Sequence, residues 1–221
     1  MVGPIKHRLL IYVSIIIFSV SGIAVAGQVS DASKPSGIET IIIIRHAEKP
    51  KDGLGQLSIT GLKRSLLLPD FFKNNFPRPD YIFAPNPAVK HFENHGDKQY
   101  HYYVRPLLTI APTAITLEMP VNTGIGLDAP KDLVKTLLAP EYHNSTIIVA
   151  WEHSQIVEIA KMFIDHFHSD AKVPQWSNKN FNMFFVFTID WNKKQDQLKF
   201  NVRSEGFDDL SGKAIHPAYL N

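Results

Sequence analysis

The sequence predicts an α/β fold with three layers, α/β/α, in which a mostly parallel central sheet is followed by a C-terminal β-hairpin. Residues 40–44 and 146–151 are apolar runs rich in β-branched side chains, as in strands that are buried on both faces of a parallel sheet. Helical patterns separate and follow these runs, and two further β-rich runs lie near the end of the chain. Strands that alternate with helices indicate this layered arrangement.

The first segment, residues 1–26, has the features of a secretory signal peptide. Lys6 and Arg8 give a positive start, a long apolar run follows, and Ala24-Val25-Ala26 forms an A-x-A cleavage site. We expect cleavage near Gly27 and a periplasmic or secreted protein. The apolar run also approaches the roughly 18 residues that mark a membrane-spanning candidate, so retention as an anchor is the alternative.

The rest of the composition fits one domain. Residues 27–38 form a polar linker, and residues 39–221 have a normal length for a single domain with one core. Without Lys6 and Arg8 the basic residues fall from 23 to 21 and balance the 21 acidic ones. Such a balance gives no electrostatic footprint for nucleic acid. The chain has no cysteine, which excludes disulfides and a lipid-modified cysteine.

Several helices are expected between the strands. Residues 61–75 have apolar side chains at helical spacing, with Ser58 or Thr60 as the cap and Pro69 expected to kink or divide the helix. Two shorter helices are expected at residues 106–117 and 130–138, each with proline in the first turn.

The second half of the chain gives the strongest helix and the hairpin. Residues 154–168 carry one apolar stripe at helical spacing, which we assign to the core. Residues 182–191 and 198–203 are β-rich, and the polar residues 192–197 separate them. This pattern predicts a terminal hairpin.

Each buried strand ends in residues that suit phosphoryl chemistry. Arg45 and His46 follow the first strand, and Glu152 and His153 follow the second. Ligands of open α/β sheets bind beyond the carboxyl ends of the strands, so we expect both histidines to face one pocket. A guanidinium group binds phosphate through paired hydrogen bonds, and an imidazole serves as nucleophile or proton carrier.

The motifs, in their order, resemble those of the histidine phosphatase superfamily, which has the phosphoglycerate-mutase-like fold. The resemblance extends from Thr40 to about Phe167. Its Arg-His-Gly signature is matched by residues 45–47, although Ala47 stands in place of glycine. The other matching segments are Leu57-Ser58-Ile59-Thr60-Gly61, Tyr81-Ile82-Phe83-Ala84, Arg105-Pro106-Leu107-Leu108-Thr109-Ile110-Ala111 and the strand that ends at His153.

This resemblance implies an exported phosphatase that hydrolyses phosphate monoesters through a phosphohistidine on His46, with one ring N–H held by a backbone carbonyl. Arg45, Arg105 and protonated His153 are expected to stabilise the transferred phosphoryl group, and Glu152 is the first choice for the proton donor. Glu48 and Asp128 remain alternatives for this donor. Lys90 is the fallback cation for Arg105, because residues 85–104 are an insertion relative to the family.

The expected partner is a small phosphorylated substrate or phosphate ion, without nucleic acid, without a membrane once the signal is cleaved, and without cofactor or metal. A catalytically silent phosphate-binding or interaction module is the alternative, and a mutase is a weaker third option. The insertion also carries a rival set of zinc ligands, His91, Glu93, His95 and His101. A loop that caps the pocket and shapes the choice of leaving group is the other interpretation of the insertion.

Overall fold

The computed structural model describes residues 37–207, 209 and 210. The expected signal peptide, the first part of the linker up to residue 36 and the last eleven residues lie outside this range. Within the described range, no helix combines the length and the apolar character that a membrane crossing requires.

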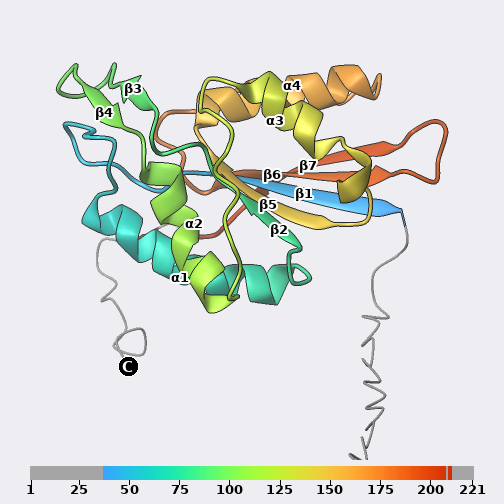
Figure 1. The fold of residues 1–221 in the computed structure, drawn as a ribbon, viewed down its shortest axis with the longest axis horizontal. Coiled ribbons are helices and arrows are strands. Elements are labelled where there is room, and N and C mark those ends of the chain that lie inside the picture. Colours follow the sequence, from blue (N-terminus) through green and yellow to red (C-terminus); the bar gives the residue numbers. More distant parts are fainter. Residues whose placement is uncertain (1–36, 208, 211–221) are drawn as a thin grey trace, which may run out of the picture. The chain divides into compact units, whose positions relative to one another are not determined.

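The centre of the fold is a five-stranded sheet with the strand order β2-β5-β1-β6-β7 (Figure 1). Its strands are β1 (Ile38–Arg45), β2 (Tyr81–Phe83), β5 (Thr146–Trp151), β6 (Met183–Asp190) and β7 (Leu198–Ser204). Strands β2, β5 and β1 are parallel to one another, whereas β6 pairs antiparallel with β1 and with β7.

The predicted three-layer class and the C-terminal hairpin are confirmed, but the sheet is mixed rather than mostly parallel. The hairpin causes this difference, because it extends the sheet at β1. Its strand β6 runs along the whole of β1, from the pair Ile38 and Asp190 to the pair Ile44 and Phe184.

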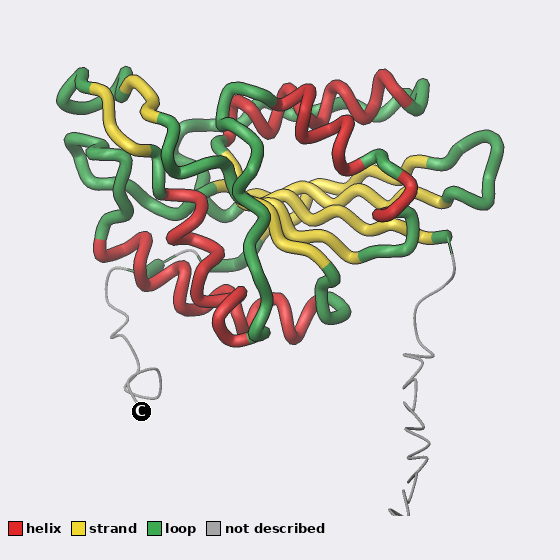
Figure 2. Tube along the Cα trace, in the orientation of Figure 1, coloured by secondary structure: helices red, strands yellow, loops and turns green. Residues whose placement is uncertain are grey.

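The isoleucines of β1 divide the core into two layers, because successive side chains of a strand point to opposite faces. Ile41 and Ile43 pack in one apolar cluster with helices α3 (Pro130–Leu137) and α4 (His153–His166). Ile42 and Ile44 pack in the other with α1 (Ile59–Asn75) and α2 (Arg105–Thr116). Figure 2 shows helices on both sides of the strands. All four isoleucines are fully buried, as expected for a strand covered on both faces.

The helices begin and end close to the predicted residues. Ser58 caps α1, since its hydroxyl accepts a hydrogen bond from the amide of Gly61 at 3.1 Å. The expectation that Pro69 divides this helix is wrong, because α1 continues from Ile59 to Asn75 with Pro69 buried inside it. Pro106 and Pro130 lie in the first turns of α2 and α3, where a missing N–H is harmless. A short 3-10 helix, Pro140–Tyr142, precedes β5.

The insertion forms a small hairpin of its own, β3 (Lys90–Phe92) and β4 (Tyr100–Tyr102). It packs on the loop that follows β1, because the amide of Asp97 donates to the carbonyl of Asp52 and the amide of Val104 to the carbonyl of Gly55. Gly55 has a φ of +64°, and a Cβ there would lie 2.1 Å from the carbonyl oxygen of Tyr102. These contacts hold the hairpin at the end of the sheet where β1 terminates.

Candidate active site

The parallel pairing of β1 with β5 brings the two predicted histidine segments to the same edge of the sheet. Arg45 pairs with Trp151, and the amide of His46 donates to the carbonyl of Trp151 at 2.9 Å. The residues that follow both strands therefore line one cavity, whose volume is about 450 Å³. Five predicted site residues lie on its wall: Arg45, His46, Arg105, Glu152 and His153.

The imidazole of His46 is buried and held in a defined orientation. Its Nδ1 lies 2.7 Å from the carbonyl oxygen of Ala47. A carbonyl only accepts hydrogen bonds, so Nδ1 carries the proton and Nε2 keeps its lone pair. Burial, together with the positive charges of Arg45 and Arg105, lowers the pKa of His46 to about 3. The ring is therefore neutral near pH 7, as a nucleophile must be.

Arg45 is held in place by the loop before β6, which the sequence does not identify as part of the site. Its Nη1 donates to three backbone carbonyls, at 3.3 Å to Ser177, 3.0 Å to Asn178 and 2.9 Å to Asn180. The guanidinium carbon also lies 3.9 Å from the ring centre of Phe181. Burial lowers the pKa of Arg45 to about 10, which leaves it cationic at neutral pH.

Arg105 is the first residue of helix α2, directly after the insertion, and it lines the same cavity. Its Nη2 is ion-paired with Glu93, and its Nη1 lies 3.4 Å from the hydroxyl of Tyr103. Burial lowers the pKa of Arg105 to about 10, so it also remains charged. The fallback residue, Lys90, does not line the cavity; its ammonium group lies 5.1 Å from the ring centre of Tyr102.

Both guanidinium groups retain a donor for an anion. The Nε atoms of Arg45 and Arg105 are buried and have no hydrogen-bond partner among residues 37–207, 209 and 210. Buried donors without acceptors are costly, and each one in a native structure calls for an explanation. A tetrahedral oxyanion in the cavity would supply acceptors to both groups.

Glu152 and His153 form the turn from β5 into helix α4. The carboxylate of Glu152 caps the helix, accepting from the amides of Ser154 at 2.8 Å and Gln155 at 3.2 Å. It is also ion-paired with Nδ1 of His153. Because β5 ends at Trp151, the backbone turns at this point, and both side chains reach one cavity although they are neighbours in sequence.

His153 has an oxygen opposite each ring nitrogen. Nδ1 faces the carboxylate of Glu152, and Nε2 lies 2.5 Å from Oδ1 of Asn178. Both oxygens are hydrogen-bond acceptors, so each ring nitrogen faces a group to which it can donate.

The contacts of Glu152 favour a positioning role over that of proton donor. Burial by itself raises its pKa, but the hydrogen bonds from His153 and Ser154 outweigh burial and lower the pKa of Glu152 to about 2. A carboxylate that several donors hold in its charged form is a poor source of a proton near neutral pH. Glu152 is instead an ionised helix cap that orients His153.

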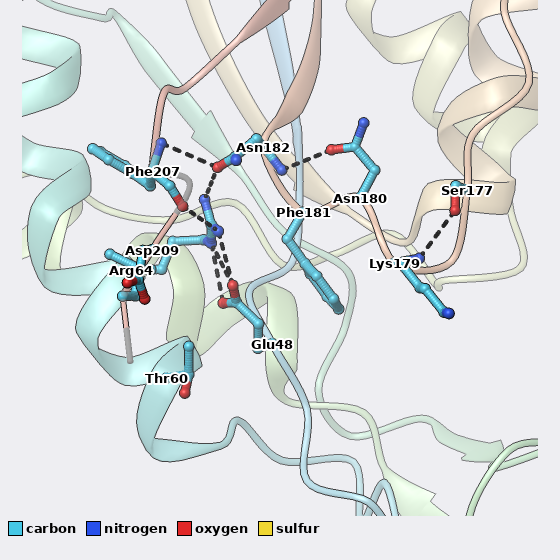
Figure 3. Close-up of a pocket in the computed structure, with 11 residues that line it drawn as sticks. Glu48, Thr60, Arg64, Ser177, Lys179, Asn180, Phe181, Asn182, Phe207 and Asp209 are labelled. Atoms are coloured by element: carbon cyan, nitrogen blue, oxygen red, sulfur yellow. Dashed lines mark hydrogen bonds and ion pairs between the residues drawn. The ribbon is translucent and has the colours of Figure 1, made fainter. Parts of the chain in front are cut away.

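The two alternative donors lie in different places. Glu48 faces Arg64, whose guanidinium holds the carboxylate at 2.8 to 3.1 Å, in a second cavity of about 500 Å³ (Figure 3). Asp128 lines the cavity of His46, and its Oδ2 lies 3.4 Å from Nδ1 of His91. Of the three carboxylates, Asp128 is the one that lines this cavity without capping a helix.

The proposed zinc ligands of the insertion are engaged with other groups. Glu93 is paired with Arg105 and Lys49, and His101 lies 2.7 Å from Asp97. The part of the chain that the structure describes contains no group of three or more histidine, aspartate or glutamate side chains arranged to hold a metal. The positions of these residues do not support a zinc site.

Several site residues had no signal in the sequence. Asn178 and Phe181 belong to an irregular loop between α4 and β6, so no periodic pattern points to them. Glu93 lies within the insertion, where the sequence indicates only a candidate metal ligand. Its actual partners, Lys49 and Arg105, are distant in sequence.

Comparison with solved structures shows which fold this is. The chain is similar to the protein histidine phosphatase SixA complexed with tungstate, with a TM-score of 0.53 and 12% identity over 75% of this chain and 97% of that chain. This likeness confirms the fold expected from the resemblance.

Two further solved structures have lower TM-scores. A SixA described as a putative phosphohistidine phosphatase, from Nakamurella, gives a TM-score of 0.48 at 16% identity over 76% of this chain and 97% of that one. A mycobacterial glucosyl-3-phosphoglycerate phosphatase gives 0.49 at 10% identity over 75% and 97%. No protein-family model and no curated protein sequence matches the chain.

Proposed function

We propose that this protein is a phosphatase that hydrolyses phosphate monoesters through a phosphohistidine intermediate on His46. The observation that best supports this proposal is one cavity lined by a buried histidine and two buried arginines, each with an Nε donor that has no partner among the described residues. A phosphate group bound there would neutralise the arginines and place phosphorus next to the nucleophile. Catalysis of phosphoryl transfer consists mostly of such positioning and of electrostatic stabilisation.

In the first half of the reaction, Nε2 of His46 attacks phosphorus and the bond from phosphorus to the ester oxygen breaks. The proton stays on Nδ1, which donates to the carbonyl of Ala47, so the ring acquires positive charge as the bond forms. The donors of Arg45, Arg105 and His153 stabilise the charge on the nonbridging oxygens. Water then attacks the phosphohistidine and returns a proton to the group that protonated the leaving alkoxide, which releases inorganic phosphate and restores neutral His46.

The leaving alkoxide needs a proton, and Asp128 is the candidate donor that fits the cavity. Its carboxyl group lies on the wall beside His91. Glu152 keeps His153 oriented, because it contacts both that ring and the first turn of α4. Each of the two carboxylates would thus have a separate task, one in proton transfer and one in positioning.

The similar structure supports this assignment of the cavity. SixA has the same fold, and it was solved with tungstate, a tetrahedral oxyanion of the same shape as phosphate. A cavity that offers arginine and histidine donors at the carboxyl ends of β1 and β5 suits an anion of this kind.

The test is hydrolysis of an aryl phosphate by the purified mature protein, with and without a chelator, beside His46→Ala. We expect turnover that resists the chelator and is lost in the variant. Turnover that the chelator abolishes would favour a metal-dependent reaction. Binding of inorganic phosphate without turnover of any phosphate ester would favour a silent binding module.

Export is the second part of the proposal and rests on the sequence of residues 1–26 alone. Protein recovered from the periplasm or the medium is expected to begin near Gly27. Recovery of the intact leader in the membrane fraction would favour the anchored form.

A further inference from the structure

Glu93 lies in the wall of the cavity and binds two cationic side chains at once. It follows strand β3 and is buried, with only 7% of its surface exposed. One carboxylate oxygen accepts from Nζ of Lys49 at 2.6 Å, and the other is paired with Nη2 of Arg105. All three side chains line the cavity that contains His46.

The surrounding backbone is shaped to accept this carboxylate. A Cβ on Gly53 would lie 2.3 Å from the carboxyl carbon of Glu93, and a Cβ on Gly96 would lie 2.9 Å from its Cγ. Gly53 also has a φ of +82°, which disfavours other residues. Lys49 is fixed further, because its ammonium group donates to the carbonyl of His95 at 3.2 Å. The Lys49–Glu93–Arg105 contact is therefore a built part of the cavity rather than a surface ion pair.

Lys49 and Arg105 are already paired with Glu93 before any substrate enters. Lys49 and the two arginines are cationic, whereas Glu93, Asp128 and Glu152 are acidic. Arg45 and Arg105 keep their Nε donors for one phosphate group, but Lys49 is neutralised by Glu93. Among the described lining residues, no lysine or arginine is left over for a second anionic group on the substrate.

We propose that Glu93 is a specificity-determining residue that restricts this site to phosphomonoesters with a neutral or cationic leaving group. The inference rests on the proposed phosphatase activity. An anionic leaving group meets the negative charge of Glu93 and gains no free cation, because Lys49 is already paired with Glu93. A leaving group that carries an ammonium or hydroxyl group finds carboxylate acceptors instead.

Three small substrates that differ in the terminal group test the proposal. Phosphoethanolamine carries an ammonium group, 2-hydroxyethyl phosphate a hydroxyl group and phosphoglycolate a carboxylate. For the wild-type protein we expect kcat/KM to be about tenfold or more lower for phosphoglycolate than for phosphoethanolamine, since like charges at a binding site disfavour association. The hydroxyethyl ester should lie close to phosphoethanolamine.

Two variants should change the ratio of kcat/KM for phosphoglycolate to kcat/KM for phosphoethanolamine in opposite directions. Glu93→Gln keeps the shape of the side chain but frees the charge of Lys49, so the relative kcat/KM for phosphoglycolate should rise about fivefold or more. Lys49→Met leaves the charge of Glu93 less compensated, so the same ratio should fall. The opposite signs separate a charge effect from a general loss of folding or of Arg105 placement.

Asp97→Asn is the matched control. Asp97 lies in the same hairpin and contacts His101, but it does not line the cavity, so the ratio should stay at the wild-type value. An unchanged ratio in Glu93→Gln, or a wild-type preference for phosphoglycolate, would overturn the inference while aryl phosphate turnover still upheld the proposed function. No turnover of any phosphate ester would overturn both.

Discussion

The carbonyl oxygen of Ala47 lies 2.7 Å from Nδ1 of His46, and this contact selects the ring nitrogen that is available to a substrate. The interaction holds the proton on Nδ1 and leaves the lone pair of Nε2 free for the proposed attack on phosphorus. The residue after the histidine is small and fully buried, so its backbone can approach the ring closely. Substitution of alanine for the family's glycine does not disturb this arrangement.

His46 is expected to remain neutral across the physiological pH range. Burial and two nearby arginines hold its pKa at about 3, so between about pH 5 and pH 8 its ring should show no titration. The ¹³C and ¹⁵N chemical shifts of the ring, assigned by comparison with His46→Gln, measure this directly. A titration midpoint near that of free histidine would contradict the buried, neutral nucleophile.

Glu152 is expected to act as a positioning residue rather than as the proton donor. Glu152→Gln removes the charge that holds His153, so kcat should fall by a similar factor for an aryl phosphate and for an alkyl phosphate. An acid catalyst would matter far more for the alkyl ester, because its alkoxide is a poor leaving group. Glu152→Ala should also lower the free energy of unfolding by about 1 kcal/mol through loss of the helix cap, which chemical denaturation can measure.

Asp128 should show the contrasting behaviour. Asp128→Asn removes the proposed source of the leaving-group proton, so kcat for the alkyl ester should fall by about 10² or more while the aryl ester is affected less. The side chain is 65% exposed, so stability should change little. Equal losses for the two esters would remove Asp128 from the proposed mechanism.

Asn178 is expected to compete with phosphate for His153. Its Oδ1 lies 2.5 Å from Nε2 of that ring, so the amide has to yield this donor when an anion binds. Asn178→Ala should therefore lower the inhibition constant of inorganic phosphate about fivefold, the effect of one hydrogen bond of ~1 kcal/mol. Weaker binding of phosphate to this variant would instead show that Asn178 holds His153 in its binding position.

The strands and their chemistry were predictable from the sequence because they depend on local patterns. Four consecutive isoleucines followed by Arg45 and His46 identify a buried strand and its carboxyl end, and Trp151 with His153 does the same for its neighbour. The parallel pairing of these strands then brings the two histidines together. The helix boundaries followed from proline and cap positions, with the exception of Pro69.

Other features depend on contacts that no local pattern records. The antiparallel addition of β6 to β1 is a choice between sheet edges, and the hairpin sequence fits either edge. The loop at residues 177–181 binds Arg45 through backbone carbonyls, which any sequence could supply. The capping role of Glu152 could not be predicted, because the amides of Ser154 and Gln155 that donate to its carboxylate become available only when α4 forms.

Glu39 provides a prediction for stability rather than activity. It is fully buried in β1, and its Oε2 accepts from Nε1 of Trp191 at 2.9 Å. Burial raises the pKa of Glu39 to about 8, although the hydrogen bond from Trp191 opposes this effect. The folded protein thus keeps a proton that the unfolded chain releases above its ordinary pKa of 4.5.

The pKa of Glu39 is higher in the folded protein than in the unfolded chain. Its contribution to the free energy of unfolding is therefore complete below the unfolded pKa and is lost as the pH rises to about 8. A glutamine side chain is neutral at every pH. The free energy of unfolding of Glu39→Gln, relative to that of the wild type, should therefore rise by on the order of 3 kcal/mol between about pH 5 and pH 8. Denaturant unfolding of both proteins at the two pH values measures this gain. Parallel pH profiles would contradict a protonated Glu39.

The most direct test of the central claim is to trap the covalent intermediate. A ³²P-labelled phosphate ester is mixed with the protein, quenched in alkali within the first turnovers, and the labelled peptide and ring nitrogen are identified. We expect an alkali-stable, acid-labile label on Nε2 of His46 that is absent from His46→Gln. Turnover without any labelled protein, or a label on Nδ1 or on His153, would contradict it.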